Sequence, residues 1–402
     1  MVTLKDIHDA KARIGTAVRI SPAVQSHVLS SIAGSPVFLK LENLQRTGSF
    51  KERGALNKLA SLSAEERRQD LVTASAGNHA QGVAYHAGLM GLKAKIWMPL
   101  TTPLAKVEAT RRHGAEVVLY GTNYDKAYDA AVEYAHEARC TFVHPFDDDQ
   151  VIAGQGTIAL ELLEQVAQLE FVIVPVGGGG LISGIAVALK GMNPALRVIG
   201  VQSSAVPSMV SAIAGAHQAP SLDALTIADG IAVRRVGSRT LPLVKEYVDD
   251  LVTVDEEEIA NAVLFLLEQE KTIAEGAGAV AVGAVLHHKV QTYGKVTAVV
   301  VSGGNIDVTL LARMIERGLV KDGRLVRLRI PLPDHPGALH QLTKVIAESR
   351  ANIVETAYHR AFCGAAPGHT VIDMTMETRG LEHGEAMFTA LANAGYHCQR
   401  IV

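Results

Sequence analysis

Short runs of apolar and β-branched residues alternate along this chain with segments of helical periodicity. The runs cover residues 71–74, 94–98, 116–120, 171–176, 197–201 and 297–301. Strands that alternate with helices build βαβ units and a mostly parallel sheet. The alternation therefore predicts an α/β fold. In such a fold, ligands bind where the carboxyl ends of strands meet the N-termini of helices.

The pattern changes near residue 325. Residues 326–330 alternate between apolar and polar side chains, as a half-buried strand does. Beyond them the sequence indicates a helix at 338–349, strands at 353–359 and 370–376, a helix at 382–394 and a short final strand. This order predicts a small βαββαβ unit of the ferredoxin-like kind. We therefore expect one domain at 1–325 and a second at 326–402.

Charge and hydropathy exclude several classes of partner. The 38 Lys and Arg residues are interspersed with 41 Asp and Glu residues, so the basic surface of a nucleic-acid-binding protein is missing. No apolar run approaches the ~20 residues that span a bilayer, and the first residues carry charges where a signal peptide is apolar. We expect a cytoplasmic protein with no nucleic-acid or membrane partner.

Cys140, Cys363 and Cys398 are widely spaced, which predicts buried free thiols rather than disulfides or a zinc site.

Four consecutive glycines follow the run at 171–176 and precede a helix-like stretch. They are Gly177, Gly178, Gly179 and Gly180. Backbone N–H groups without side chains can converge on an anion, and a helix dipole adds its positive end. A flexible turn is the alternative, but ordering glycine is entropically costly. The spacing fits neither a P-loop nor a dinucleotide-binding motif, whose next strand would end in an acidic residue instead of Gln202. The phosphate of a small cofactor fits better.

Lys51 lies between an expected strand end and a helix start. A lysine becomes a nucleophile when desolvation or a nearby cation lowers its pKa, and Phe50 and Arg53 could contribute to this. The local signal is weak, because most lysines are solvated surface charges.

Polar groups follow two other strand-like runs. Ser75, Asn78 and His79 can hold a carboxylate or a phenolic oxygen, or else cap a helix. Ser302 can bond to a ring nitrogen, or likewise cap a helix.

These segments, in this order and at these intervals, resemble the fold type II pyridoxal-phosphate enzymes, and most closely the threonine dehydratase (threonine ammonia-lyase) family, over residues 4–320. The resemblance implies two open twisted α/β domains, the smaller and mobile one at 47–146, with pyridoxal 5′-phosphate as cofactor. It also implies a role for each site residue. Lys51 would form the Schiff base with Phe50 beside it, and Asn78 would bond the 3′ oxygen of the cofactor. Gly177, Gly178, Gly179, Gly180 and Leu181 would hold its phosphate, Ser302 would face its ring nitrogen, and Ser75, Asn78 and His79 would receive the substrate carboxylate.

The implied reaction is the dehydration and deamination of L-threonine to 2-oxobutanoate and ammonia, and of L-serine to pyruvate. Lys51 would remove the α-proton, and a neutral serine at the ring nitrogen suits elimination better than transamination. A serine racemase and a β-replacement enzyme are alternatives of the same fold. Racemases of this family carry a serine where this chain has Ala76. They also carry acidic metal ligands where residues 202–208 have none, so we expect no metal there.

Glu275 either lines the ring pocket or takes part in a helix cap or salt bridge. A non-catalytic amino-acid-binding regulator is the alternative from another class, but such a protein has no use for a Schiff-base lysine.

The C-terminal segment resembles an ACT domain, on the residues at 334–339 and 351–354. In that family such loops bind amino acids between paired domains, so an amino-acid effector and allosteric regulation are implied, with dimerisation alone as the alternative. The chain would act in isoleucine biosynthesis or threonine breakdown as a homodimer or homotetramer.

Overall fold

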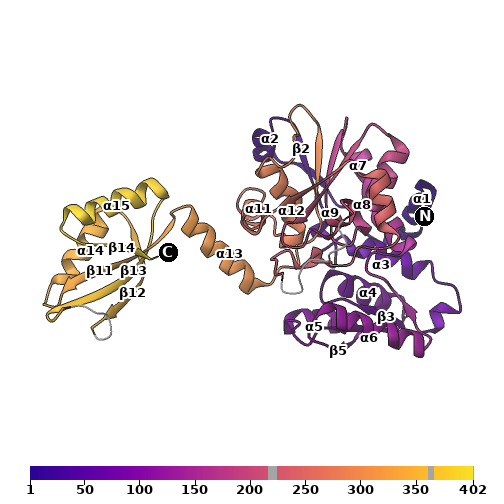
Figure 1. Ribbon diagram of the computed structural model, residues 1–402, viewed down its shortest axis with the longest axis horizontal. Coiled ribbons are helices and arrows are strands. Elements are labelled where there is room, and N and C mark those ends of the chain that lie inside the picture. The colour runs from indigo at the N-terminus through magenta and orange to yellow at the C-terminus, as the bar shows by residue number, and fades with distance from the viewer. Residues whose placement is uncertain (216–223, 361–365, 402) are drawn as a thin grey trace. The chain divides into compact units, whose positions relative to one another are not determined.

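The chain forms two compact units in the computed structural model, which describes residues 1–215, 224–360 and 366–401. The units are Met1–Asp307 and Val308–Val402 (Figure 1). The division falls before helix α13 (Val308–Lys321), whereas the sequence placed it near residue 325.

Among the described residues, no helix is long and apolar enough to cross a membrane. Cys140 and Cys398 are free but only half-buried, contrary to the expectation of buried thiols, and Cys363 lies outside the described residues.

The first unit contains a six-stranded sheet in the order β1-β2-β10-β7-β8-β9. Its strands are β1 (Ala23–Gln25), β2 (Val37–Leu41), β7 (Phe171–Pro175), β8 (Arg197–Ser203), β9 (Asp250–Val254) and β10 (Thr297–Val301). All neighbouring pairs are parallel except β1 with β2. The central strands β7 and β10 are buried along their whole length, which explains their continuous apolar sequences.

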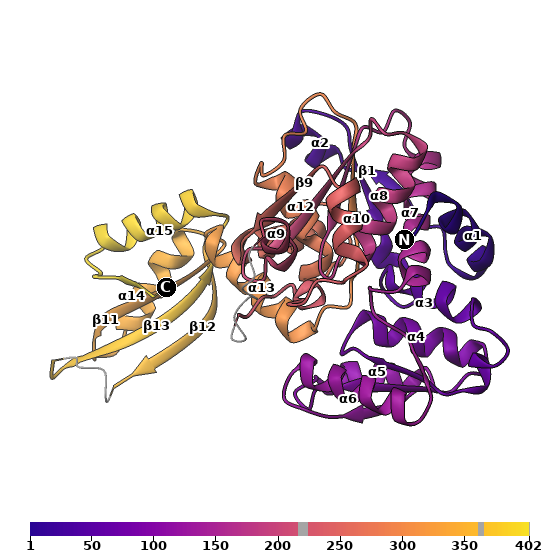
Figure 2. The same ribbon diagram turned by 45° about the vertical axis from the view of Figure 1, so that its right-hand side comes forward.

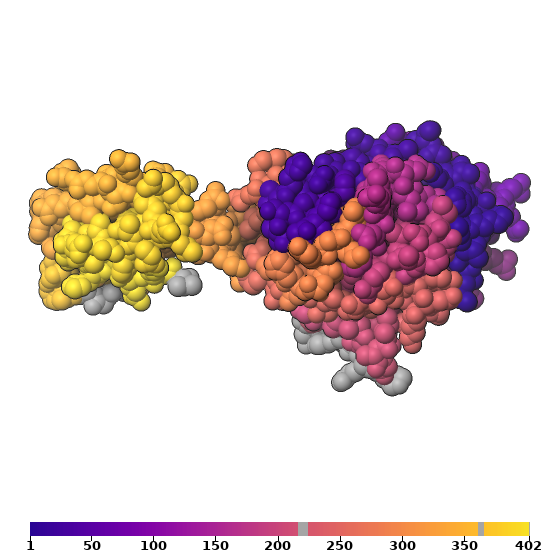
Figure 3. Space-filling model, turned by 90° about the horizontal axis from the view of Figure 1, so that it is seen from above, coloured from indigo at the N-terminus to yellow at the C-terminus, as the bar shows by residue number. Residues whose placement is uncertain are grey.

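Helices cover this larger sheet. α8 (Gly180–Met192) and α12 (Gly276–Leu286) pack against its central strands, and α7 (Asp149–Gln165) packs against α8. Helix α1 (Leu4–Ile14) packs on α7, so the N-terminal segment (indigo) forms part of the outer surface of this unit (Figure 3).

A second, four-stranded parallel sheet in the same unit has the order β5-β4-β3-β6. Its strands are β3 (Leu71–Ala74), β4 (Ala94–Met98), β5 (Glu116–Leu119) and β6 (Thr141–Phe142). Helices α4 (Asn78–Leu89), α5 (Leu104–Arg112) and α6 (Tyr124–Glu137) accompany it below the larger sheet in Figure 2. The strands predicted from the apolar runs are confirmed, whereas β1, β2, β6 and β9 lie in none of those runs.

The second unit contains the predicted βαββαβ order, which is confirmed. Its elements are β11 (Leu325–Pro333), α14 (Ala338–Glu348), β12 (Asn352–His359), β13 (His369–Glu377), α15 (Leu381–Asn393) and β14 (Gln399–Ile401). The sheet is antiparallel with the order β12-β13-β11-β14. Alternate residues of β11, namely Leu328, Ile330 and Leu332, are buried in a core shared with α14 and α15.

A buried ion cluster joins helix α3 (Lys51–Ala60) to β2 and α7. Arg53 of α3 has no exposed surface and donates hydrogen bonds to Glu42 at 2.8 Å and to Glu161 at 2.6 Å. Lys40 of β2 donates to the other oxygen of Glu161 at 2.5 Å. Buried charges are tolerated only when they are paired and hydrogen-bonded. Since Arg53 follows Lys51 by two residues, the cluster fixes the first turn of α3.

We expect Arg53→Ala to lower the free energy of unfolding by about 3–5 kcal/mol, because Glu42 and Glu161 would stay buried with too little positive charge. Chemical denaturation measures this change. The matched control is Lys11→Ala, which breaks an exposed ion pair with Glu164 and should cost about 1 kcal/mol or less. An equal, small loss in both variants would contradict the prediction.

Candidate active site

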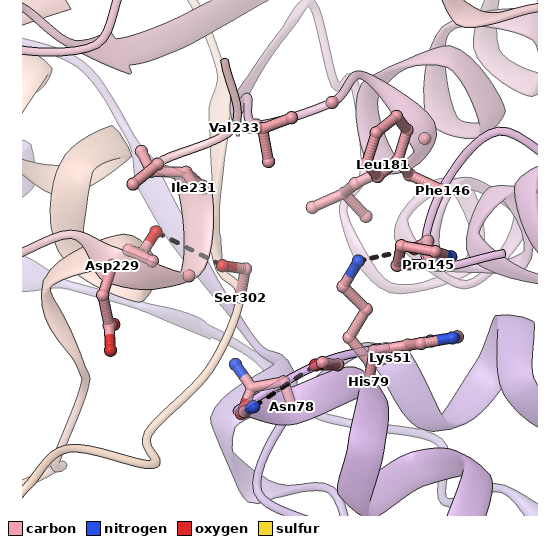
Figure 4. A pocket seen from close by; sticks show the side chains of 18 of the residues that line it. Lys51, Asn78, His79, Pro145, Phe146, Leu181, Asp229, Ile231, Val233 and Ser302 are labelled. Atoms are coloured by element: carbon pink, nitrogen blue, oxygen red, sulfur yellow. Dashed lines mark hydrogen bonds between the residues drawn. The ribbon is translucent and has the colours of Figure 1, made fainter. Parts of the chain in front are cut away.

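The carboxyl ends of β3, β7 and β10 open on one cavity of about 330 Å³ in the first unit (Figure 4). Its lining contains every residue that the sequence named for the site: Phe50, Lys51, Ser75, Asn78, His79, Gly177, Gly178, Gly179, Gly180, Leu181, Glu275 and Ser302. Ala76 lines it as well. Residues separated by more than 250 positions in the sequence thus meet at one place, while their individual roles stay predictions.

Lys51 is the first residue of α3, and its side chain extends into the cavity (Figure 4). Its Nζ donates a hydrogen bond to the carbonyl oxygen of Pro145 at 2.7 Å. Burial lowers the pKa of Lys51 to about 8, although the charge of Glu275 opposes the shift. Arg53 was expected to help lower the pKa of Lys51. This expectation is wrong, because the Arg53 guanidinium is paired with the carboxylates of Glu42 and Glu161. Desolvation therefore makes the Lys51 amine available near neutral pH.

The start of α3 is tied to the end of β10. The N–H of Phe50 donates to the carbonyl oxygen of Ser302 at 3.0 Å, and Ser49 pairs with Gly303. The Phe50 ring centroid lies 5.2 Å from Lys51 Nζ. These contacts hold Lys51 and Ser302 in the same wall region although they belong to different elements.

Asn78, the first residue of α4, is oriented from both ends of its amide. Its Nδ2 donates to Glu275 Oε1 at 2.5 Å, and its Oδ1 accepts from Asn305 Nδ2 at 2.7 Å. Glu275 is buried, and burial raises the pKa of Glu275 to about 7, with the charge of Asp229 adding to the shift. Glu275 thus lines the pocket, and its carboxyl accepts the Asn78 amide. Asn305 was not named from the sequence, although it ends the segment that begins at Ser302.

The N-terminus of α4 faces the cavity next to Ser75. No side-chain hydrogen bond caps this helix in the described structure, and the Ser75 hydroxyl instead accepts from the N–H of Gly77 at 3.2 Å. The His79 ring is buried against the carbonyl oxygen of Val143 at 3.1 Å, and burial lowers the pKa of His79 to about 3. His79 is therefore neutral, and free backbone N–H groups at a helix N-terminus suit a carboxylate.

The glycine loop leads into α8, whose start likewise has no side-chain cap. A Cβ at Gly178 would lie 2.4 Å from the Phe146 ring, and one at Gly179 would lie 2.7 Å from Met209. Gly179 also has a φ of +95°, which favours glycine. The loop is thus packed too closely for side chains, and the uncapped N–H groups of α8 are suited to bind a phosphate.

Ser302 follows β10 directly and is buried. Its hydroxyl donates a long hydrogen bond of 3.4 Å to the carbonyl oxygen of Ala277. A buried hydroxyl with one weak partner can still donate to or accept from a ring nitrogen.

Sequence reasoning also missed an ion pair in the cavity wall. Lys106 of α5 and Asp229 of the 3₁₀ helix η4 (Asp229–Ile231) both line the cavity, with Nζ and Oδ2 2.7 Å apart. Neither residue belongs to a recognisable motif, and only the fold brings them together.

Comparisons with known proteins place this site in a class. Residues 14–303 match the family described as "Pyridoxal-phosphate dependent enzyme". The chain belongs to this family, whose members use pyridoxal phosphate as cofactor.

Three similar proteins are named for reactions of threonine or serine. The chain is 49% identical to the L-threonine ammonia-lyase of Thermotoga maritima, over 98% of each chain. A solved structure of threonine deaminase isoform 2 from Solanum lycopersicum has a TM-score of 0.73 and 37% identity, covering 78% of this chain and 87% of that one. Maize serine racemase is also similar, with a TM-score of 0.73 and 32% identity over 80% of this chain and 98% of that one.

We expect Gly178→Ala to weaken pyridoxal phosphate binding by about tenfold or more, because the added methyl group would overlap the Phe146 ring, and overpacking costs roughly 1–3 kcal/mol. Titration of the apoprotein with the cofactor, followed by visible absorbance, measures the affinity. Gly384→Ala in α15, where the nearest atom lies 3.5 Å away, is the control and should not change it. Adding Phe146→Leu to Gly178→Ala should restore affinity, and no rescue would argue against this packing explanation.

Proposed function

We propose that this chain is an L-threonine ammonia-lyase that converts L-threonine to 2-oxobutanoate and ammonia, and L-serine to pyruvate and ammonia. The relative of 49% identity, matched over 98% of both chains, supports the substrate. The observation that carries the proposal is the meeting of a desolvated lysine, an uncapped helix N-terminus and a glycine loop in one cavity.

The cavity residues fit the cofactor. The glycine loop packs too closely against Phe146 and Met209 for a Cβ at Gly178 or Gly179, and we assign its N–H groups to the phosphate together with the N–H of Leu181. Asn78 is assigned to the 3′ oxygen and Ser302 to the ring nitrogen, where a neutral hydroxyl leaves the nitrogen without a charged partner. Lys51 is the group that would bond covalently to the cofactor. When bound, the cofactor supplies an aldehyde carbon for amines and a ring that withdraws electrons.

Residues of the protein bind the substrate, remove its α-proton and exclude water. The N-terminus of α4, with Ser75, Asn78 and His79, holds the substrate carboxylate. Once the substrate amine has replaced Lys51 on the cofactor, the released Nζ would remove the α-proton, which its lowered pKa allows near neutral pH. The walls around Lys51 exclude water during the proton transfer. Because His79 is neutral and bound to Val143, it contributes its backbone N–H rather than a charge.

Racemisation is the second candidate, because maize serine racemase is similar in structure. It needs an acid or base on the opposite face of the substrate, and at the position where racemases carry a serine this chain has Ala76, which lines the cavity without a proton to exchange. Elimination is therefore favoured. A β-replacement reaction would yield a new amino acid from serine and sulfide in place of the 2-oxoacid.

The second unit is proposed to be an ACT-like domain that binds an amino acid. Its βαββαβ order and the segment 334–339, which leads from β11 into the first residues of α14, support this. Effector binding between paired domains would require at least a homodimer.

Lys51→Ala should abolish turnover and covalent attachment of the cofactor, since no other amine would occupy the same place. Borohydride reduction of the loaded protein followed by mass spectrometry of peptides detects the attachment directly. The control is Lys58→Ala, which changes a lysine of the same helix that pairs with Asp148. Near-normal activity or an unchanged adduct in Lys51→Ala would remove the central assignment.

The reaction itself is tested by 2-oxoacid release from L-threonine and L-serine with the loaded protein. We expect rapid 2-oxobutanoate formation, whose rate changes when isoleucine or valine is added. A rate independent of both amino acids would leave the lyase standing and count against the effector proposal. Conversion of L-serine to D-serine without 2-oxoacid would favour the racemase.

A further inference from the structure

The cavity holds a second lysine that the mechanism above does not use. Lys106 enters from α5, beside the smaller sheet, and its Nζ lies 2.7 Å from Asp229 Oδ2. Asp229 belongs to a segment that follows β8 of the larger sheet. The pair therefore joins the two halves of the first unit at the cavity wall.

The position of this pair separates it from the phosphate cradle. In Figure 4, Asp229 lies on one side of the cavity, and Leu181, which follows the glycine loop, lies on the other. The Lys106 side chain is only 20% exposed, whereas that of Asp229 is 59% exposed. Burial opposes the charge of Lys106, but Asp229, Glu275 and Asp307 together raise the pKa of Lys106. Lys106 therefore stays protonated inside the cavity.

Under the proposed function the other charged groups that line the cavity are already engaged, Glu275 among them through its hydrogen bond with Asn78. The cofactor takes Lys51 and the glycine loop, and the α-carboxylate of the substrate takes the N-terminus of α4. Arg234 also lines the cavity, but its guanidinium lies 3.8 Å from Asp125. The side chain of the substrate therefore faces the part of the cavity wall where the positive charge of Lys106 and the negative charge of Asp229 balance.

We propose that the Lys106–Asp229 pair determines which amino-acid side chains the enzyme accepts, an inference that rests on the proposed function. Lys106 is a latent receptor for a second carboxylate, and Asp229 masks it. Neutral side chains such as those of threonine and serine meet no net charge. A dicarboxylic amino acid must displace Asp229 from Lys106 and then face Asp229 as a like charge. A cationic side chain would meet Lys106.

A purely structural role is the competing explanation, because the pair also connects α5 to η4. The two explanations differ in their consequences. If the pair only holds the two halves together, breaking it changes the turnover of all substrates alike. If Asp229 masks Lys106, its removal changes the ratio between a dicarboxylic and a neutral substrate.

The test compares L-threonine with L-threo-3-hydroxyaspartate, in which a carboxylate replaces the β-methyl group and the same elimination yields oxaloacetate and ammonia. In the cofactor-loaded Asp229→Asn variant, we expect the ratio of kcat/KM for hydroxyaspartate to kcat/KM for threonine to rise about tenfold or more. The reason is that Lys106, a partly buried cation, is then free to bind the second carboxylate. Adding Lys106→Met to Asp229→Asn should abolish the gain.

The matched control is Asp129→Asn. Asp129 is a carboxylate of similar exposure, 66%, that pairs with Arg235 between the same halves and is absent from the cavity lining described above. It should leave the substrate ratio unchanged. A ratio that rises equally in this control, or not at all in Asp229→Asn and in a second variant, Asp229→Ala, would overturn the proposal.

A binding measurement separates this inference from the proposed function. L-Aspartate carries the second carboxylate but has no β-hydroxyl to lose, so calorimetry on the loaded proteins reports its binding alone. We expect tighter binding to Asp229→Asn than to the parent. If the parent protein does not deaminate threonine, the lyase proposal fails. If the aspartate affinity of Asp229→Asn equals that of the parent, the proposed role of the pair is refuted.

Discussion

The buried ion cluster around Arg53 is the interaction on which the arrangement of the site depends. Arg53, Lys40, Glu42 and Glu161 come from α3, β2, the turn after β2 and α7, and none of their charges can be left without a partner inside the protein. This requirement leaves α3 little freedom to rotate or slide. The first residue of α3 is Lys51, so the position of the nucleophile follows from an electrostatic constraint two residues further along the helix.

The rest of the cavity is assembled across the two sheets of the first unit. Asn78 begins α4, which accompanies the smaller sheet, whereas Glu275 precedes α12 and Asn305 follows β10 of the larger sheet. Both orient the Asn78 amide. The Lys106–Asp229 pair joins the same two halves. Desolvation acts on both titrating groups in opposite directions, since it lowers the pKa of Lys51 and raises that of Glu275. Both shifts reduce the charge that Lys51 and Glu275 carry near neutral pH.

Much of this architecture could be predicted from local patterns. Buried parallel strands need long apolar runs, so β7 and β10 were evident, and four glycines between a strand and a helix are rarely explained by packing alone. The short strands β1, β6 and β9 were not evident, because strands of two to five residues with partly exposed side chains carry little periodic signal. The contribution expected from Arg53 to the pKa of Lys51 was wrong, since adjacency in sequence does not show where a guanidinium points.

The sequence by itself determined the α/β class, the glycine loop and the βαββαβ order of the second unit. These features are encoded in composition and spacing over short stretches, where backbone conformation and periodicity dominate. The tertiary structure decided what Lys51 donates to, which groups hold the Asn78 amide, and that Lys106 faces Asp229 in the cavity wall. Those outcomes depend on desolvation and on contacts between residues more than 90 positions apart, which no local pattern contains.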